Sequence, residues 1–129
     1  MTLILVVEDE KNIARAVKDK LAREGFTVES VHSGEEALSC LERSIPALII
    51  LDVMMPDMDG YEVVRRVRAD QRMHSVKIML LTVLPEEEKE PGVEVDAWLR
   101  KPYKGADLIE KVRALTAPAS PTAQNLGNP

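Results

Sequence analysis

Short apolar runs alternate with stretches of helical spacing along this chain. The runs lie at residues 3–7, 27–31, 47–51, 78–81 and 97–99; the second alternates apolar with polar side chains, and the last is the weakest. Continuous apolar runs of this length are typical of strands buried on both faces, as in a parallel sheet. The pattern therefore predicts five strands of an α/β fold.

Apolar residues recur at helical spacing between these runs. They form four stripes, made of Ile13, Ala16, Val17 and Leu21; of Ala37, Leu38 and Leu41; of Val63, Val64 and Val67; and of Leu108, Ile109, Val112 and Leu115. Such stripes indicate amphipathic helices that pack one side on a sheet. Strands and helices in alternation predict an open, doubly wound parallel sheet with right-handed crossovers.

Polar residues predict where two helices begin, and a proline followed by a glycine predicts where another helix ends early. Two pairs have the spacing of a capping box, Ser33 with Glu36 and Asp59 with Glu62. Residues 85–90 could start a helix between the fourth and fifth strands, but Pro91 and Gly92 stop it early. We therefore expect the fourth helix to be short or irregular.

Composition narrows the class of protein. The 129 residues fit one domain, and a formal net charge of −5 is unfavourable for a general nucleic-acid surface. No apolar run approaches the roughly 20 residues of a membrane span, and residues 1–7 lack the basic start of a signal peptide. The single cysteine, Cys40, excludes an internal disulfide framework. We expect a cytoplasmic protein that contacts neither nucleic acid nor membrane directly.

The composition changes after Thr116. Residues 117–129 contain Pro, Ala, Ser, Asn and Gly and have no apolar periodicity. Such a segment is typical of a flexible tail or the stub of a linker. We expect one domain over residues 1–116 and a tail over 117–129.

Charged and hydroxyl side chains stand at the ends of the predicted strands. Glu8 and Asp9 follow the first strand, Asp52 follows the third, Thr82 ends the fourth and Lys101 follows the fifth. The carboxyl ends of strands in a doubly wound sheet form one ligand-binding edge. Clustered carboxylates repel each other unless a cation is present, and oxygen ligands favour a hard cation such as Mg²⁺. Because a carboxylate beside such a metal can attack phosphorus, the pattern predicts phosphoryl transfer.

Four segments carry a resemblance to a known family: residues 6–10, 51–60, 81–82 and 101–103. Together they resemble the receiver domain of two-component response regulators, and the similarity covers about residues 2–116. The segment 51–60 is the most specific. The resemblance implies a flavodoxin-like, five-stranded parallel sheet with strand order 2-1-3-4-5 and helices on both faces.

The resemblance also implies how the acids act. Asp52 would accept a phosphoryl group from a histidine kinase or a phosphotransfer protein. Asp9 and Asp52 would bind Mg²⁺ directly, with Mn²⁺ as a possible substitute. Glu8 would act through a water molecule, and Met54 would donate its backbone carbonyl.

The remaining roles concern the phosphoryl group and the output. Lys101 would bind the phosphoryl group, Thr82 would swing its hydroxyl toward it, and Trp98 would move inward. The peptide bond from Lys101 to Pro102 would be cis. The domain would catalyse its own phosphorylation and slow dephosphorylation, and so switch its contacts with a downstream protein or effector domain that the sequence does not identify.

Three features depart from the family pattern. Thr82 and Lys101 are 19 positions apart, a shorter interval than the family usually has, and the loss falls on the fourth helix. Val83 replaces a residue that is often small, and its branched side chain could narrow access to Asp52. Trp98 is bulkier than the usual tyrosine, phenylalanine or histidine, so an inward rotamer needs a larger gap.

These departures leave two alternatives open. The first is a receiver-like interaction module that works without phosphorylation. The second is a phosphatase with an aspartyl intermediate, but such enzymes usually have a second aspartate two residues after the nucleophile. Met54 stands there and supplies no general acid.

Overall fold

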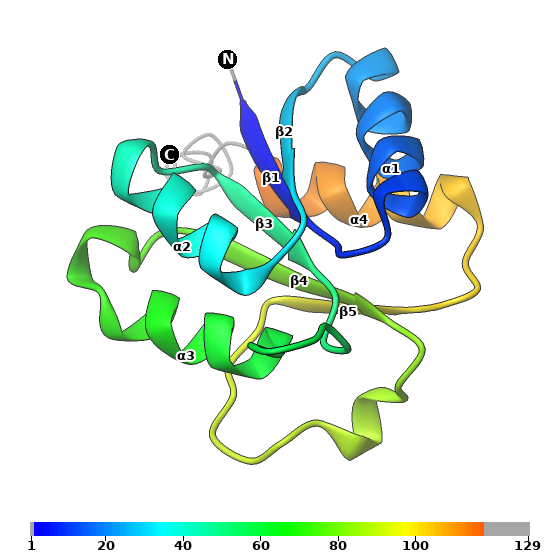
Figure 1. The fold of residues 1–129 in the computed structure, drawn as a ribbon. Helices are drawn as coiled ribbons and strands as arrows, with labels where there is room; N and C mark the ends of the chain where they lie inside the picture. The colour runs from blue at the N-terminus through cyan, green and yellow to red at the C-terminus, as the bar shows by residue number, and fades with distance from the viewer. Residues whose placement is uncertain (1, 118–129) are drawn as a thin grey trace, which may run out of the picture.

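A five-stranded parallel sheet forms the centre of the molecule (Figure 1). The computed structural model describes residues 2–117, so the expected tail lies outside the described residues from 118 onward. The strands are β1 (Leu3–Val7), β2 (Thr27–Val31), β3 (Leu48–Leu51), β4 (Lys77–Thr82) and β5 (Ala97–Arg100). Their order, β2-β1-β3-β4-β5, confirms the predicted flavodoxin-like topology.

Four helices cover the two faces of the sheet. They are α1 (Lys11–Arg23), α2 (Gly34–Arg43), α3 (Gly60–Ala69) and α4 (Gly105–Thr116). Helices α1 and α4 lie on one face, and α2 and α3 lie on the other (Figure 1). Within residues 2–117 no helix is long and apolar enough to cross a membrane.

Two polar caps start the helices of one face. Ser33 Oγ accepts a hydrogen bond from the Glu36 amide at 3.1 Å, and Asp59 Oδ1 accepts one from the Glu62 amide at 3.0 Å. These bonds satisfy backbone donors that the first turn of a helix leaves free. The Glu36 carboxylate accepts from the amide of His32, one residue before the cap. Both predicted helix starts are therefore confirmed.

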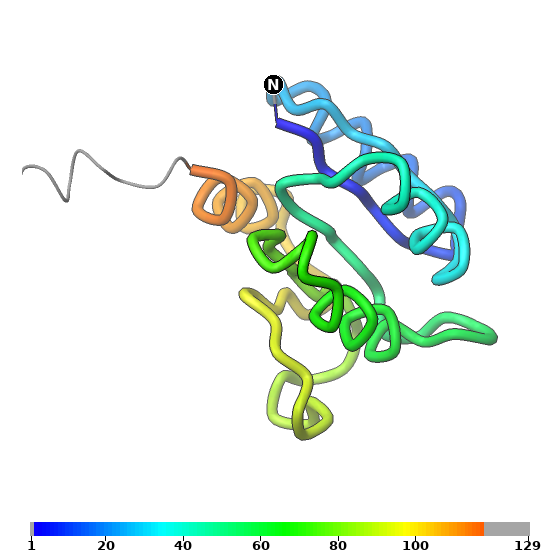
Figure 2. The backbone as a smooth tube through the Cα atoms, turned by 90° about the vertical axis from the view of Figure 1, so that its left-hand side faces the viewer, coloured from blue at the N-terminus to red at the C-terminus, as the bar shows by residue number. Residues whose placement is uncertain are grey.

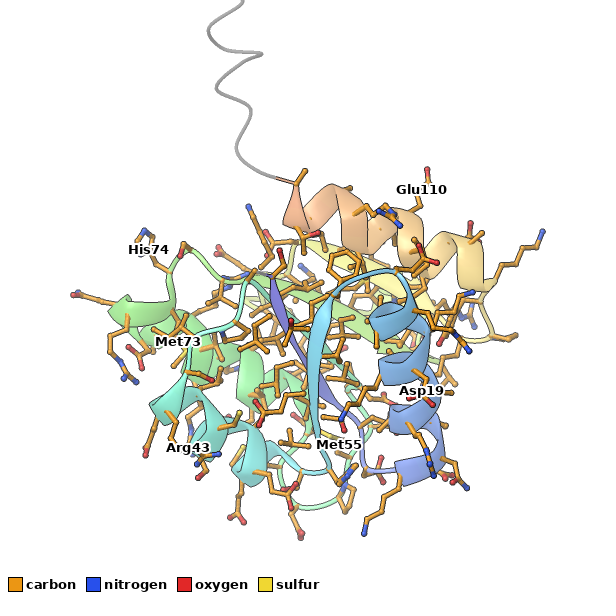
Figure 3. All side chains as sticks on the ribbon, turned by 90° about the horizontal axis from the view of Figure 1, so that it is seen from above. Asp19, Arg43, Met55, Met73, His74 and Glu110 are labelled. Carbon is orange, nitrogen blue, oxygen red and sulfur yellow. The ribbon has the colours of Figure 1, made fainter. Side chains whose placement is uncertain are left out.

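The core consists of two apolar layers, one on each face of the sheet. Along the central strands successive side chains alternate between the layers, so that Leu5 and Val7 face α2 and α3 while Ile4 and Val6 face α1 and α4. Viewed from above, Met55 and Met73 point inward, whereas Asp19, Arg43 and Glu110 point away from the core (Figure 3). Burial on both faces explains why these strands are almost wholly apolar.

One position of the first predicted stripe is wrong. The side of α1 that is buried consists of Ala14, Val17 and Leu21, whereas Ala16 is exposed. Residues 14, 17 and 21 follow one line along a helix, and residue 16 lies to the side of that line. Ile13, at the margin, is half-buried.

The segment that joins β4 to β5 is irregular, as predicted. The sequence predicts a short or irregular fourth helix here. The segment contains only a 3₁₀ turn, η2 (Glu86–Glu88) (Figure 2). Pro85 precedes this turn, and Gly92 follows it with a φ of 82° that an ordinary helix does not allow. The segment 83–96 therefore needs side-chain contacts to hold its shape.

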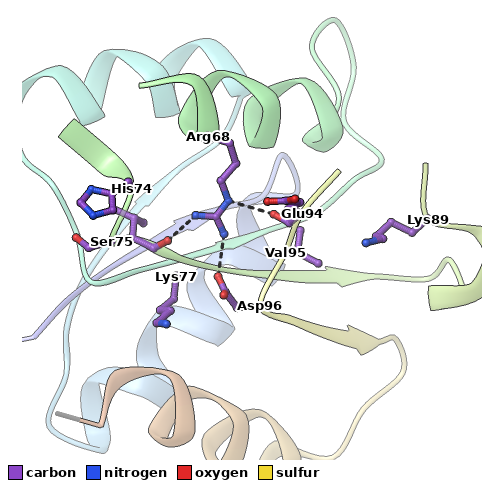
Figure 4. A pocket seen from close by; sticks show the side chains of 9 residues that line it. Arg68, His74, Ser75, Lys77, Lys89, Glu94, Val95 and Asp96 are labelled. Atoms are coloured by element: carbon purple, nitrogen blue, oxygen red, sulfur yellow. Dashed lines mark hydrogen bonds and ion pairs between the residues drawn. The ribbon is translucent and has the colours of Figure 1, made fainter. Parts of the chain in front are cut away.

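Arg68 on α3 holds the later part of this segment. Its guanidinium donates to the Glu94 carbonyl at 3.1 Å, to the Val76 carbonyl at 2.9 Å and to Asp96 Oδ2 at 2.8 Å (Figure 4). The same carboxylate oxygen accepts from the Ile78 amide at 2.8 Å. The entrance to β5 is thus fixed to both α3 and β4.

Candidate functional site

The carboxyl ends of four neighbouring strands bring the predicted side chains to one edge of the sheet. Glu8 and Asp9 follow β1, Asp52 follows β3, Thr82 ends β4 and Lys101 follows β5. The Asp52 amide donates to the Val7 carbonyl, and the Lys101 amide donates to the Thr82 carbonyl at 2.7 Å. Strand pairing therefore continues just beyond the strands and fixes the backbone under these side chains.

Lys101 joins two of the acids directly. Its Nζ lies 3.0 Å from Glu8 Oε1 and 2.9 Å from Asp52 Oδ2. Both carboxyl groups are buried, Glu8 with 4% and Asp52 with 8% of its surface exposed. Ion pairs in such surroundings are weakly screened by solvent, and removal of one partner leaves a buried charge. The ammonium group thus compensates one of two neighbouring negative charges.

Burial and charge change the proton affinity of two groups. Burial raises the pKa of Glu8, and the nearby Asp52 charge adds to this, although the hydrogen bond from Lys101 acts in the opposite direction. Burial alone would lower the pKa of Lys101, but its hydrogen bonds to Asp52 and Glu8 outweigh that effect and raise it. The lysine therefore stays cationic at neutral pH, and the site holds an excess of acid.

Backbone amides orient the remaining carboxylate oxygens. The Met54 amide donates to Asp52 Oδ1 at 3.0 Å, and the Glu10 amide donates to Glu8 Oε2 at 3.1 Å. The Met54 side chain is 56% exposed, so only its backbone takes part in this contact. Each acid therefore has one oxygen on Lys101 and the other on an amide.

Thr82 and Trp98 meet at Leu84. Thr82 is fully buried, and its Oγ1 accepts from the Leu84 amide at 3.4 Å. The Trp98 indole Nε1 donates to the Leu84 carbonyl at 2.9 Å, and the ring is 7% exposed. In this structure the threonine hydroxyl is thus engaged with the segment after β4.

The donor set fits Mg²⁺ with water better than a closed protein cage. Within residues 2–117 no three His, Cys, Asp or Glu side chains form a group tight enough to hold a metal. Mg²⁺ usually takes one or two carboxylates and keeps several waters. The buried carboxylates of Glu8 and Asp52 share one ammonium group, and the half-buried Asp9 follows Glu8 in the chain; such a set suits a cation that keeps several waters.

Sequence reasoning missed three residues at this edge. Gly60 packs so closely under the Asp52 backbone that an added Cβ would lie 2.8 Å from the Val53 Cα. His32 follows β2, and its Nδ1 lies 3.1 Å from the Glu8 carbonyl. Leu84 joins Thr82 to Trp98 through its backbone. The strand-end argument could have found His32. Gly60 belongs to the segment 51–60 that carries the family resemblance, which gave it no role of its own, and Leu84 acts through backbone contacts that have no sequence signature. The Lys101–Pro102 peptide bond is cis.

Comparison with known proteins now decides the family. Residues 4–113 match the family described as "Response regulator receiver domain". The chain belongs to this family. A receiver domain is a signalling switch of two-component systems, whose partners include histidine kinases, and not an enzyme in the usual sense.

Relatives of this receiver domain include longer proteins and single domains. The "Probable transcriptional regulator ycf27" of Porphyra purpurea is 36% identical over 129 residues, which cover 98% of this chain and 52% of that protein. A signal receiver domain of a histidine kinase from Syntrophus aciditrophicus has a TM-score of 0.83 at 31% identity, covering 93% of both chains. The response regulator TrrA of Thermotoga maritima, solved in complex with Mg(2+)-BeF, has a TM-score of 0.80 at 34% identity, covering 89% of this chain and 99% of that one. The chain spans about half the length of the curated relatives it matches.

A hollow of the receiver domain lies away from this edge. It has a volume of about 830 Å³ and lies around Arg68, His74 and Lys77, near the amino end of β4 (Figure 4). Its arginine donates to the Glu94 and Val76 carbonyls and to the Asp96 carboxylate. The Arg68 side chain in this hollow therefore helps to hold the segment 83–96 in place.

Proposed function

We propose that this receiver domain accepts a phosphoryl group on Asp52 and thereby switches its contacts with a downstream protein. The observation that carries the proposal is the ammonium group of Lys101, which lies within 3.0 Å of carboxylate oxygens from both Glu8 and Asp52. A nucleophile, a cation for the phosphoryl oxygens and a second acid thus share one edge of the sheet. Phosphoryl transfer needs mainly such alignment and neutralisation of charge.

The transfer step involves the Asp52 carboxylate and a donor phosphohistidine. A carboxylate oxygen forms a bond to phosphorus while the phosphorus–nitrogen bond of the donor breaks, and the leaving imidazole takes the electron pair and a proton. Lys101 then turns from Asp52 Oδ2 to a phosphoryl oxygen. Slow attack of water on the acyl phosphate, promoted by the domain itself, returns free phosphate and Asp52.

The same acids would hold Mg²⁺. Asp9 and Asp52 are proposed as direct ligands, Glu8 as a ligand through water, and the Met54 carbonyl as a backbone ligand. Bound Mg²⁺, or Mn²⁺ in its place, neutralises negative charge that develops on the transferring phosphoryl oxygens. The response regulator TrrA, solved in complex with Mg(2+)-BeF, supports Mg²⁺ binding by this domain through similarity.

We assign the switch to Thr82 and Trp98. Phosphorylation would draw the Thr82 hydroxyl from the Leu84 amide to the phosphoryl group, which biases the segment after β4 toward a second arrangement. Trp98 is bonded to the same residue and would report or control that movement.

The donor would approach from an apolar groove beside Lys101. This groove of about 600 Å³ is lined by Ile13 and Ala16 of α1, by Val83 and by Pro102 and Tyr103. An exposed apolar surface beside a reactive group favours a protein donor, a histidine kinase or phosphotransfer protein. We further propose that the domain comprises residues 1–116, that residues 117–129 are a tail or the stub of a linker, and that the domain acts in the cytoplasm.

Intact-mass measurement tests the proposal. The protein is incubated with phosphoramidate and Mg²⁺, and we expect one phosphoryl adduct on the wild type and none on Asp52→Ala. Asp57→Asn is the matched control, because Asp57 is an exposed acid of the same loop whose positive φ of 68° asparagine tolerates. Absence of an adduct on the wild type, or an equal adduct on Asp52→Ala, would refute the proposal.

One alternative keeps the fold without the chemistry. The irregular segment 83–96 and the exposed Val83 favour an interaction module that works without phosphorylation. Titration with Mg²⁺ separates the two, because Trp98 is the single tryptophan and reports through its fluorescence. A change on Mg²⁺ binding that requires Asp52 supports the phospho-acceptor, and no response to Mg²⁺ supports the module.

A further inference from the structure

His32 follows the edge strand β2, directly beside the first acid of the site. The parallel pairing of β1 with β2 runs to Val7 and Val31, and it places the next residue of each strand side by side. The Glu8 amide donates to the Val31 carbonyl at 3.1 Å, and the His32 imidazole Nδ1 lies 3.1 Å from the Glu8 carbonyl. Both backbone polar groups of Glu8 are therefore held by residues at the end of β2.

The contact with Glu8 determines which ring nitrogen of His32 carries the proton. A carbonyl oxygen only accepts hydrogen bonds, so the imidazole donates from Nδ1–H. Glu8 is 4% exposed, so few waters can replace the imidazole as donor to its carbonyl. Loss of the Nδ1–H would leave this carbonyl without a partner, which is unfavourable for a buried acceptor.

Glu36 of α2 fixes the backbone of His32. Its Oε1 accepts from the His32 amide at 2.8 Å, while its own amide donates to the Ser33 hydroxyl that caps the helix. In the usual capping box the acid returns to the amide of the capping residue itself. Here the acid reaches one residue further back, so the start of α2 is connected through the imidazole to Glu8.

Glu8 passes this constraint to the charged edge of the sheet. One carboxylate oxygen of Glu8 lies 3.0 Å from Lys101 Nζ, and the other accepts from the Glu10 amide at 3.1 Å. Asp9, the half-buried acid proposed as a direct metal ligand, lies between the two residues that this second contact joins. The direction of the Asp9 carboxylate therefore depends on the backbone at Glu8.

We propose that His32 is a positioning residue that holds the Glu8 backbone through its Nδ1–H and so keeps Glu8 and Asp9 in place for Mg²⁺. This role rests on the proposed function, because the cation is needed there for phosphoryl transfer to Asp52. His32 does not touch the metal in this role, which requires a donor at Nδ1 and not a charge. The residue lies outside the four segments that carry the family resemblance.

Substitutions at residue 32 test this role through Mg²⁺ affinity. His32→Leu removes the donor, whereas His32→Asn keeps a side-chain N–H close to the position of Nδ1. In Mg²⁺ titrations followed by Trp98 fluorescence, we expect the Kd to rise about fivefold for His32→Leu, the factor that corresponds to one net hydrogen bond. His32→Asn should restore the wild-type Kd. The matched control is His74→Leu, which removes an exposed imidazole 3.4 Å from the Gln71 carbonyl and should leave the Kd unchanged.

Glu36→Leu tests the path from α2. If Glu36 acts through the imidazole, this substitution should weaken Mg²⁺ binding in the wild type and have no further effect in His32→Leu. Glu35→Leu, at the neighbouring exposed acid, corrects for the loss of one negative charge. The proposal is overturned if His32→Leu binds Mg²⁺ as tightly as wild type, if His32→Asn is as weak as His32→Leu, or if the corrected effect of Glu36→Leu persists without the histidine.

Amide exchange tests the same contact in metal-free protein. The Glu10 amide reports on the Glu8 carboxylate, and the Met54 amide reports on the Asp52 carboxylate of the same edge. By NMR we expect exchange at Glu10 to be about fivefold faster in His32→Leu and unchanged in His32→Asn, with no change at Met54 in either variant. Equal exchange at Glu10 in His32→Leu and wild type would overturn the link. Failure of the proposed function would instead appear as an absent phosphoryl adduct on the wild type.

Discussion

Lys101 keeps two buried acids in contact that would otherwise repel each other. Its Nζ contacts Glu8 and Asp52 at 3.0 and 2.9 Å, and its side chain is only 16% exposed. The lysine thus stabilises the resting site and stands ready to bind a phosphoryl oxygen. At the scale of single residues, stability and reactivity depend on the same ammonium group.

Lys101→Met should lower stability in a way that Mg²⁺ reverses. Two buried carboxylates lose their cation, so we expect a loss of roughly 2 kcal/mol in the free energy of unfolding without metal. Without Lys101 the Glu8 and Asp52 carboxylates attract another cation more strongly, so Mg²⁺ should stabilise the variant more than the wild type. Urea denaturation with and without Mg²⁺ measures both effects. Lys104→Met, at an exposed position, is the control, and an equal response of the two variants would contradict the prediction.

Gly60 and Gly34 provide a matched pair of substitutions. Each is the first residue of a helix that follows a capping side chain. An added Cβ at Gly60 would meet the rigid Asp52–Val53 backbone, whereas at Gly34 it would meet side chains only, Met58 at 2.9 Å and Val63 at 3.0 Å. We expect Gly60→Ala to cost about 2–3 kcal/mol and Gly34→Ala less than about 1 kcal/mol in thermal or urea unfolding. Equal costs would show that the contact with the Asp52 backbone does not constrain residue 60.

At the scale of elements, the segment 83–96 differs most from a regular helix. It is held near β4 by the Trp98 indole and near β5 by the Arg68 guanidinium. The Arg100 guanidinium also donates to the Val83 carbonyl at 3.1 Å, and Arg65 of α3 forms an ion pair with Glu90. Within the segment, Lys89 donates to the Val93 carbonyl at 2.8 Å. Hydrogen bonds from distant side chains thus replace the internal bonds of a helix, and the segment depends on its surroundings for its shape.

Arg68→Met should loosen the later part of this segment without disturbing the phospho-acceptor edge. The variant loses three hydrogen bonds, and we expect the free energy of unfolding to fall by about 2 kcal/mol. Amide exchange should rise over residues 89–96 and stay unchanged at residues 52–54. The control is Arg66→Met, which breaks one exposed ion pair with Glu62 and should cost under about 0.5 kcal/mol. Uniformly faster exchange over the whole sheet would contradict a local role for Arg68.

At the scale of the whole molecule, we expect the two apolar layers and the parallel sheet to unfold together, as small single domains usually do. Cys40 reports this directly, because it lies on α2 at 3% exposure within the layer shared by α2 and α3. Burial raises the pKa of its thiol, so less of the reactive thiolate forms at a given pH than in an unfolded chain.

Labelling of Cys40 should therefore follow global unfolding. At pH 8 we expect Ellman's reagent to react slowly with the native protein and rapidly in urea. Added Mg²⁺ with beryllofluoride should slow the native reaction further, because ligands that bind only the folded state stabilise it. The Asp52→Ala variant serves as the control, since its labelling should not respond to beryllofluoride. Fast labelling of the native protein would contradict the burial of this thiol.

Local patterns along the chain were enough to predict the helices, the strands and the edge of the sheet where the reactive side chains lie. Apolar runs predict buried strands, and turn and cap residues predict helix ends, because both depend on neighbours a few positions away. Strand-end placement then brought Glu8, Asp52 and Lys101 to one edge. The error at Ala16 arose because a short stripe does not fix which side of a helix faces the sheet.

Which side chains bond to each other depends on the folded arrangement and could not be predicted from local patterns. Lys101 reaches Glu8 across 93 positions and Asp52 across 49, Arg68 reaches back over β4, and Leu84 joins Thr82 to Trp98. Such partners depend on strand register, on the path of an irregular segment and on individual rotamers, none of which a local pattern encodes. The interactions that control the site are therefore the ones that packing, and not periodicity, selects.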